Sequence, residues 1–208
     1  MIKRTGTGTE MHLSDEAAQR LIADILQGDT EAFAPLVSDY TPLFYSLHKR
    51  LLPFDTPENR EDDVQEIFLR IFRALPTFST GRSFFSWSYT IAINYIRSRR
   101  RKKRRGKQIK PLELDDAVLL TLADTNSEDP EEMAVANEAE TLLIRALQEV
   151  PESHRQVFVL RIMQGLSVQE TSQVLHIPEG TVKNRLHRCR EQLARWMENH
   201  DWQIDPPR

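Results

Sequence analysis

The strongest constraint on the fold lies near the C-terminus, where residues 165–197 read GLSVQETSQVLHIPEGTVKNRLHRCREQLARWM. Ser167 and Glu170 have the spacing of a capping box, which opens a helix that we expect to end near Leu175. The sequence His-Ile-Pro at 176–178 must then turn the chain, because a residue before proline is pushed out of the α region. A second helix is expected from about Thr181. Two short helices around a tight turn predict a helix-turn-helix.

The second of these helices has an apolar face and a basic face. The apolar positions repeat at helical spacing and are Val182, Leu186, Cys189, Leu193 and Trp196. Residues 183–195 hold five basic side chains and one acidic one. We therefore expect this helix to lie in a major groove and to read base edges near its N-terminus. The alternative is an amphipathic helix whose charged face is only solvated, and Cys189 is expected to be a packing residue.

The charges of the chain are strongly segregated along the sequence. The net charge is -3 over 208 residues, yet residues 97–110 hold ten basic residues and no acid, and residues 111–140 hold ten acids and no base. Such local values decide the partners of a protein more than the total does. The single cysteine excludes an internal disulfide, and no apolar run reaches the length of a membrane span. These features predict a cytoplasmic protein without membrane insertion.

The predicted fold class is all-α, with two small helical domains, each with its own core, joined by a flexible acidic linker. We expect a flexible leader at 1–12, a first domain at 13–108, the linker at 109–138, a second domain at 139–200 and a tail at 201–208. In the first domain, Ser14 and Gly28 should bound the first helix. Pro42 predicts a kink or break in the next helix, and residues 52–61 should form a loop.

The segment EDDVQEIFLRIFRALPTF predicts the strongest helix of the N-terminal half. Its apolar stripe is Val64, Ile67, Phe68, Ile71, Phe72 and Leu75. Asp62, Asp63, Gln65 and Glu66 crowd the start of this helix, where the helix dipole favours carboxylates. A D-D-x-x-E metal site is an alternative, but no second cluster of carboxylates or histidines completes it in the sequence. Two interpretations of the polar residues remain: they stabilise the start of the helix electrostatically, or they form a protein-binding surface.

The segment SFFSWSYTIAINYIRSRRRKKRR predicts a helix that is aromatic at its start and basic at its end. Phe84, Trp87, Ile91 and Tyr95 can face a core, which leaves Phe85 and Tyr89 without an obvious buried place. Bases of single-stranded nucleic acid stack on aromatic rings while cations follow the phosphates. This combination favours a nucleic-acid surface over the alternative, an ordinary aromatic core stripe.

The two blocks together, in this order and on either side of an acidic linker, resemble an extracytoplasmic-function (ECF) sigma factor of the sigma-70 family. The resemblance covers about residues 20–106 and 138–197, as regions two and four of the family. His176 replaces a common turn glycine of the family, and histidine tolerates a left-handed conformation better than most residues.

The resemblance implies three sets of site residues. The polymerase-binding set is Asp62, Asp63, Gln65, Glu66 and Arg70. The set that captures and melts the minus-10 element is Phe78, Arg82, Phe85, Trp87, Tyr89, Asn94, Arg97, Arg100 and Arg101. The minus-35 set is Thr181, Lys183, Asn184, Arg185, His187, Arg188 and Arg190.

The implied function is that of a bacterial transcription initiation factor without catalytic activity or cofactors. Its implied partners are core RNA polymerase (through the β′ clamp helices and the β flap), promoter DNA and an anti-sigma factor. The acidic linker would thread the polymerase channel. The alternative is a conventional helix-turn-helix regulator, which leaves the aromatic and basic block unexplained. An enzyme is less well supported, because the sequence shows no nucleophile with its base, phosphate-binding glycine loop or metal cluster.

Overall fold

The computed structural model describes residues 13–79, 81–106 and 130–200, and within these ranges the regular structure is helical throughout. The elements in chain order are α1 (Asp15–Leu26), η1 (Thr30–Phe33), α2 (Ala34–Leu51), α3 (Pro57–Ala74), η2 (Leu75–Thr77), α4 (Phe84–Gly106), α6 (Pro130–Glu149), α7 (Glu152–Phe158), η3 (Val159–Met163), α8 (Val168–Leu175) and α9 (Glu179–Asn199). The predicted all-α class is confirmed. The expected leader, tail and most of the expected linker (residues 1–12, 201–208 and 107–129) lie outside the described residues.

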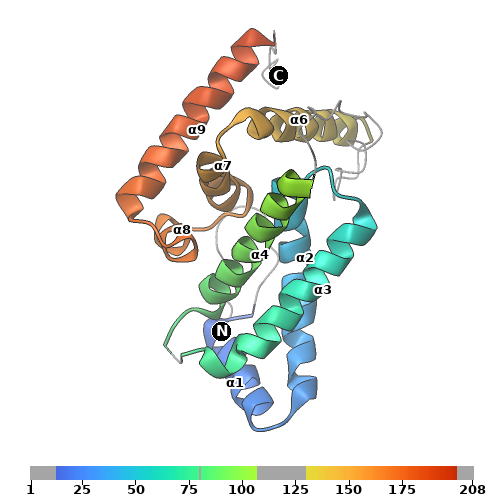
Figure 1. Cartoon of the computed structure of the whole chain (residues 1–208), viewed down its shortest axis with the longest axis vertical. Coiled ribbons are helices and arrows are strands. Elements are labelled where there is room, and N and C mark those ends of the chain that lie inside the picture. The colour runs from blue at the N-terminus through green and yellow to red at the C-terminus, as the bar shows by residue number, and fades with distance from the viewer. Residues whose placement is uncertain (1–12, 80, 107–129, 201–208) are drawn as a thin grey trace.

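The N-terminal group consists of α1 to α4, in which the long helices α2, α3 and α4 pack side by side (Figure 1). Ser14 caps α1 by accepting a hydrogen bond from the backbone N–H of Ala17 at 3.2 Å, as the sequence predicts. At the start of α4 the cap comes partly from another helix. The Asp15 carboxylate of α1 accepts hydrogen bonds from the Phe84 N–H (3.0 Å) and the Ser83 hydroxyl (3.2 Å). The N-terminus of α4 is therefore fixed to α1.

Two predictions for this group need correction. We predicted a kink or a break at Pro42, and the break is absent, because helix α2 continues through this proline. Tyr40, Phe44 and Leu47 are buried on either side of the proline, and the packing of such residues offsets a proline cost of about 3 kcal/mol. The expected loop at 52–61 is also shorter, because α3 starts at Pro57 behind the N-cap Thr56. Proline is well suited to the first helical position, since its missing N–H would have no partner there.

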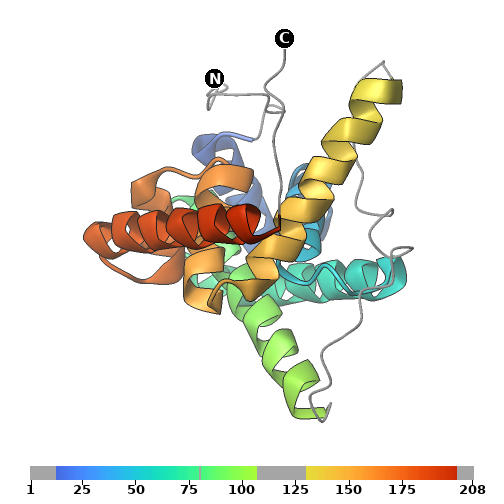
Figure 2. The ribbon, with the colours of Figure 1, turned by 90° about the horizontal axis from the view of Figure 1, so that it is seen from above.

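The C-terminal group contains α6 to α9 and holds the predicted helix-turn-helix. The capping box of Ser167 and Glu170 opens α8, and His176 ends it in the left-handed conformation with φ 53°. The second helix of the pair, α9, begins at Glu179, two residues earlier than expected, and meets α6 (Figure 2). Helix α6 begins at Pro130, so residues 130–138, which we predicted as linker, are helical.

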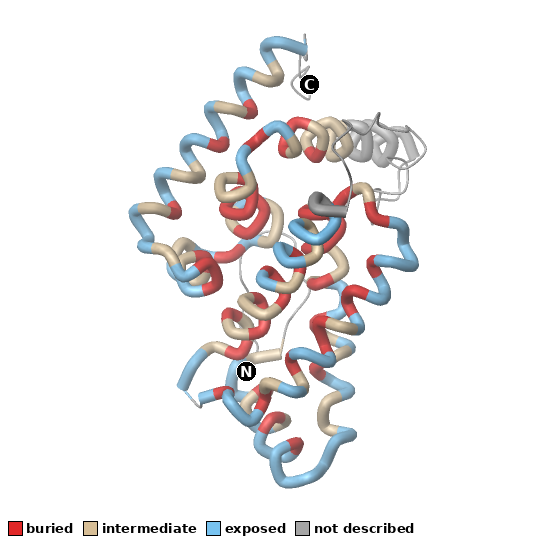
Figure 3. Tube along the Cα trace, in the orientation of Figure 1, coloured by how far each residue is buried: buried red, intermediate tan, exposed pale blue. Residues whose placement is uncertain are grey.

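The two groups share one hydrophobic core instead of the two separate cores that the sequence predicts. One cluster holds buried residues from Ala18 in α1 to Leu193 in α9, and only Ile144 of α6 lies apart from it among the buried hydrophobic residues that the structure describes. Buried segments lie on both sides of the place where α4 meets the C-terminal group (Figure 3). The contact is made chiefly by α4 with α8 and by α2 with η3. This junction brings the predicted DNA-melting helix against the predicted helix-turn-helix.

Candidate nucleic-acid and polymerase interface

The basic face of α9 is open to solvent. Val182, Cys189 and Leu193 are buried and attach α9 to the core. Five of the predicted minus-35 residues are exposed, namely Lys183, Asn184, His187, Arg188 and Arg190, while Thr181 and Arg185 are half-buried. The structure therefore places all seven on or beside one accessible surface.

A shallow hollow marks the N-terminal end of this surface. It is lined by His154 of α7 together with Gly180, Thr181, Asn184, Arg185 and Arg188. Arg188 also lies 3.7 Å from the Glu191 carboxylate, an exposed pair that contributes little to stability. The Arg188 guanidinium can therefore exchange this partner for another at small cost. Cys189 faces the other way, and burial raises the pKa of its thiol to about 12, which keeps it protonated and unreactive.

The aromatic half of α4 is buried more completely than the sequence predicts. Tyr89, which we expected to be free for nucleic acid, has no exposed surface, and its ring packs against Phe44 and Phe85 at centroid distances of 5.6 and 4.5 Å. Burial also raises the pKa of the Tyr89 hydroxyl. In this arrangement Tyr89 is a core residue.

Two other predicted minus-10 aromatics, Phe78 and Trp87, cluster with Phe84 at the entrance to α4. The Phe78 ring meets those of Phe84 and Trp87 at 5.8 and 5.1 Å. Phe78 and Phe84 are buried, whereas Trp87 and Phe85 are half-buried and Arg82 is exposed. Trp87 and Phe85 are therefore packed against other rings and still partly accessible.

The second half of α4 carries an exposed polar face. Asn94, Arg97 and Arg101 are exposed, and Arg100 is half-buried. Arg99 is also half-buried, because its side chain is turned back toward α3. The exposed polar face thus begins at Asn94, beyond Thr90, whose hydroxyl donates to the Val174 carbonyl of α8 at 3.4 Å.

The polymerase-binding set on α3 divides into exposed residues and one buried residue. Asp62, Gln65 and Arg70 are exposed, and Glu66 pairs with Arg70 at 2.8 Å. Leu69, which sequence reasoning missed, lies among them with 49% of its surface exposed. The signal was present, since Leu69 falls outside the apolar stripe of α3. An exposed leucine surrounded by polar groups is typical of a protein-contact surface.

Asp63 does not lie on this surface, contrary to the predicted set. It is only 2% exposed. Its carboxylate accepts hydrogen bonds from Tyr95 Oη (2.5 Å) and Arg99 Nε (3.0 Å), and one oxygen lies 2.8 Å from His48 Nε2. Burial alone would raise the pKa of Asp63, but the hydrogen bonds from His48, Tyr95 and Arg99 outweigh it and lower the pKa to about 2. Asp63 is thus an ionised organising residue inside the N-terminal group.

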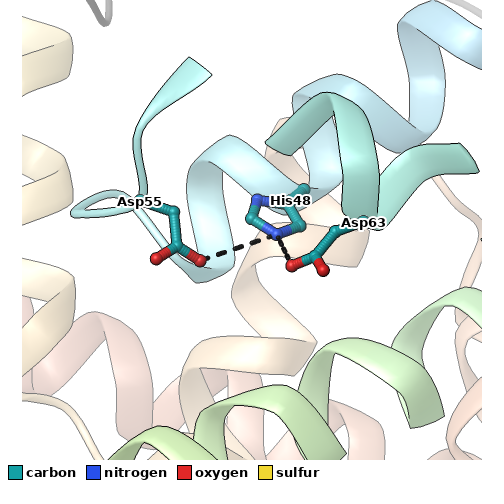
Figure 4. Close-up of side chains that lie close together, drawn as sticks. All are labelled: His48, Asp55 and Asp63. Carbon is teal, nitrogen blue, oxygen red and sulfur yellow. Dashed lines mark hydrogen bonds and ion pairs between the residues drawn. The ribbon is translucent and has the colours of Figure 1, made fainter. Parts of the chain in front are cut away.

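His48, Asp55 and Asp63 are the group of side chains that could hold a metal ion in the described part of the chain. One ligand atom from each lies within 4.8 Å of the others (Figure 4). Asp62 and Glu66 of the D-D-x-x-E pattern are not part of it. Both carboxylates of the group are already paired with cations, Asp55 with Lys103 and Asp63 with Arg99.

Polar contacts tie the two groups of helices together. The Gln164 side chain, just after η3, accepts a hydrogen bond from Tyr89 Oη at 3.0 Å and donates one to the Ser46 hydroxyl at 3.2 Å. Arg50 donates to the Met163 carbonyl at 2.5 Å and lies 3.6 Å from Glu140. Through Gln164, the hydroxyl of Tyr89 takes part in the junction.

Among the described residues, no helix is long and apolar enough to cross a membrane.

Comparison with known proteins covers both groups of helices. The model of sigma-70 region 2 matches residues 36–106, and that of sigma-70 region 4 matches residues 140–193. The ECF RNA polymerase sigma factor SigW of Bacillus subtilis is 32% identical over 184 residues, which is 87% of this chain and 97% of that protein. The ECF RNA polymerase sigma-E factor of Escherichia coli K12 is 30% identical over 178 residues, covering 84% of this chain and 91% of that protein.

Solved structures show the same fold. CnrH in complex with the cytosolic domain of CnrY has a TM-score of 0.65 at 21% identity, covering 88% of this chain and 98% of that one. The sigma factor RpoE of Bartonella quintana, in complex with the anti-sigma factor NepR, has a TM-score of 0.60 at 18% identity, covering 81% and 98%. The sequence motifs, the all-helical fold and the relatives agree: the chain belongs to the ECF group of the sigma-70 family, the factors that direct RNA polymerase to promoters.

Proposed function

We propose that this sigma factor reads the minus-35 element with α9 and opens the minus-10 element with α4 and the loop before it. The observation that carries the proposal is that two basic helix faces, one in each domain, are open to solvent at the same time. Region 4 presents Lys183, Asn184 and Arg188, and region 2 presents Arg97 and Arg101. A protein with two such faces can contact two separate promoter elements.

At the minus-35 element we assign base contacts to Lys183, Asn184 and Arg188. They lie in the N-terminal half of α9, the part of a recognition helix that enters the major groove. Arginine donates two hydrogen bonds to guanine and asparagine pairs with adenine, which gives each a defined base preference. The remaining members of the minus-35 set, Thr181, Arg185, His187 and Arg190, are assigned to phosphates.

At the minus-10 element we assign an unpaired base to the entrance of α4. Phe85 and Trp87 offer half-buried rings on which a base can stack, and Arg82 is exposed beside them. Asn94, Arg97, Arg100 and Arg101 then follow the strand along the helix. Tyr89 can join this surface only after α8 leaves α4.

Region 2 is assigned the main contact with the polymerase β′ clamp helices. Its surface consists of Asp62, Gln65, Glu66, Leu69 and Arg70, and the apolar Leu69 provides the centre that a polar ring of contacts needs. Asp63 supports this surface from inside. Region 4 is assigned to the β flap. The chain acts as a non-catalytic subunit in the cytoplasm, where the polymerase works.

We further propose that an anti-sigma factor binds this chain. CnrH and the Bartonella RpoE, which share its fold, were solved with CnrY and with the anti-sigma factor NepR. A regulator that covers the exposed face of α3 or of α9 would block the assigned polymerase or promoter contacts. The chain's own regulator would be found by mass spectrometry of proteins that co-purify with it and that core polymerase displaces.

The test is transcription in vitro from a library of the source organism's upstream DNA, with sigma-free core polymerase and with or without this protein. The proposal predicts discrete start sites that need the protein and that share elements near minus 35 and minus 10. A conventional helix-turn-helix regulator would instead bind duplex DNA tightly alone, give no start sites and not associate with core. That result would overturn the proposal.

A further inference from the structure

The basic end of α4 has two faces with different surroundings. Tyr95, Arg99 and Lys103 are four residues apart and therefore share one face of the helix. Asn94, Arg97 and Arg101 lie roughly opposite, at 100° per residue. The first face contacts the cluster formed by His48, Asp55 and Asp63, which we call the acidic anchor, while the second face is exposed.

The acidic anchor is built from two elements and the turn between them. His48 belongs to α2, Asp63 to α3, and Asp55 to the connection that joins these helices (Figure 4). His48 has no exposed surface, and its Nε2 lies between the carboxylates, 2.8 Å from Asp63 and 3.8 Å from Asp55. The Asp55 backbone carbonyl also accepts a hydrogen bond from the buried Arg60 at 3.2 Å. Contacts within α2, α3 and their connection therefore hold the two carboxylates in place independently of α4.

Each carboxylate of the anchor binds a different turn of α4. Arg99 Nε lies 2.8 Å from Asp63 Oδ1, beside the hydrogen bond from Tyr95 Oη, and Lys103 pairs with Asp55 one turn later. The side chains of Arg99 and Lys103 are 38% and 44% exposed, whereas those of their partners are 3% and 4% exposed. Both basic side chains thus reach inward from the helix surface to fixed acceptors.

The same contacts argue against a metal ion in the anchor. A divalent cation bound to both carboxylates would have to displace Arg99 and Lys103, which already balance their two negative charges. Displacement would release the end of α4 from α3.

We propose that the acidic anchor is a positioning site, which holds the Tyr95, Arg99 and Lys103 face of α4 so that Arg97 and Arg101 point at promoter DNA. On this proposal Lys103 and Arg99 bind carboxylates of the protein and not DNA, although they lie in the middle of the basic run at 97–110. The inference rests on the proposed function for the identity of the ligand. The anchoring itself is a property of the free chain.

The first experiment compares Lys103→Gln with Lys102→Gln, a neighbouring exposed lysine. Amide hydrogen exchange of the free protein is measured over residues 97–106. The proposal predicts that Lys103→Gln speeds exchange in this segment about tenfold, because the ion pair that attaches the last turns of α4 to Asp55 is lost. Lys102→Gln should change the exchange rate by less than about twofold. Equal exchange in the two variants would overturn the anchoring role.

The second experiment is a charge swap, measured with reconstituted holoenzyme on a promoter found by the transcription assay. Open complexes are quantified by permanganate reactivity of unpaired thymines. Asp55→Lys and Lys103→Asp should each lower the open-complex fraction about tenfold, and the double variant should recover most of it, since coupled charges are not additive. Arg101→Asp, on the exposed face, should not be rescued by Asp55→Lys.

Two results would overturn the positioning role. If Lys103 contacts a phosphate, the double variant will be no better than Lys103→Asp, and Lys103→Gln will reduce the salt dependence of promoter binding by about one ion. If the anchor is a metal site, ZnCl₂ or MnCl₂ will raise the Tm of the wild-type protein but not of Asp55→Asn.

If Asp55→Lys does not fold, the comparison of hydrogen exchange in Lys103→Gln and Lys102→Gln decides the proposal. Failure of the proposed function would appear separately, as absence of binding to core.

Discussion

The two helices assigned to promoter DNA differ in what surrounds them. Helix α9 sends Val182, Cys189 and Leu193 inward and leaves its basic face open along its length. The aromatic half of α4 lies between the helices of region 2 on one side and α8 on the other, which leaves Tyr89 with no exposed surface. The residues that we assign to the minus-35 element are therefore exposed or half-buried in this structure, while Tyr89, which we predicted for the minus-10 element, is covered.

On the proposed function, this difference would separate promoter binding from promoter melting. Among the described residues, the polar contacts that cross the junction include the two hydrogen bonds of Gln164, the hydrogen bond from Thr90 to the Val174 carbonyl, and the contacts of Arg50 with Met163 and Glu140. A typical hydrogen bond is worth about 0.5 to 1.5 kcal/mol net, so the hydrophobic core that the two groups share also contributes to holding them together. A free chain that keeps Tyr89 covered does not expose a large aromatic surface to unrelated single strands.

The largest effect on stability is expected for Tyr89→Ala, which tests whether this aromatic residue of α4 belongs to the hydrophobic core. Deleting a large buried aromatic side chain costs about 3 to 5 kcal/mol, because transfer energy is lost and a cavity remains. We expect this loss in the free energy of unfolding of the free chain, measured by urea denaturation.

Asn94→Ala, on the exposed face of the same helix, is the control and should change stability by less than about 0.5 kcal/mol. If Tyr89→Ala lowered the free energy of unfolding by no more than Asn94→Ala, Tyr89 would not be a core residue. The aromatic half of α4 would then be as accessible as the basic face of α9.

A smaller and more local effect is expected for Arg188→Ala on α9. Because Arg188 is exposed, its removal should leave stability within about 0.5 kcal/mol of wild type. Holoenzyme binding to the promoter should weaken by about 1 to 3 kcal/mol, and the loss should vanish on DNA altered at the one base pair that Arg188 reads. Competition binding with singly substituted promoters measures this.

Arg190→Ala, at an exposed residue of α9 that we assign to a phosphate, should weaken all promoter variants alike. Uniform weakening by Arg188→Ala as well would identify Arg188 as a phosphate contact.

Local signals in the sequence predicted the elements, and long-range packing decided how α4 and Asp63 are used. The capping box at Ser167 and the turn at His176 depend on neighbouring residues, and both were predicted correctly. The spacing of apolar residues in α4 predicted one buried face. The helix is covered on two sides, because α8 packs on it as well as the helices of region 2. No pattern within α4 reports on a domain whose sequence begins more than twenty residues later.

Asp63 shows the same limit for a polar residue. Its position near the start of a helix favoured a surface role, and the acidic residues beside it are indeed accessible. Its partners His48 and Arg99 lie 15 residues before and 36 residues after it, where no local pattern points to them. Leu69 is the opposite case, since its place outside the apolar stripe was visible in the sequence.

The smallest effect, expected for Gln164→Ala, tests the junction itself. The change removes the acceptor of Tyr89 Oη and the donor to Ser46, at a net cost to the closed state of about 1 kcal/mol, which is about fivefold in the closed-to-open ratio. Energy transfer between dyes on cysteines introduced at the exposed residues Arg73 and Ala194, in a Cys189→Ala background, measures this ratio. Transfer should fall for Gln164→Ala and stay constant for Gln169→Ala, an exposed glutamine of α8. If both variants behave like the parent, these hydrogen bonds do not hold the domains together, and the cover over Tyr89 must come from the apolar contacts of α4 with α8.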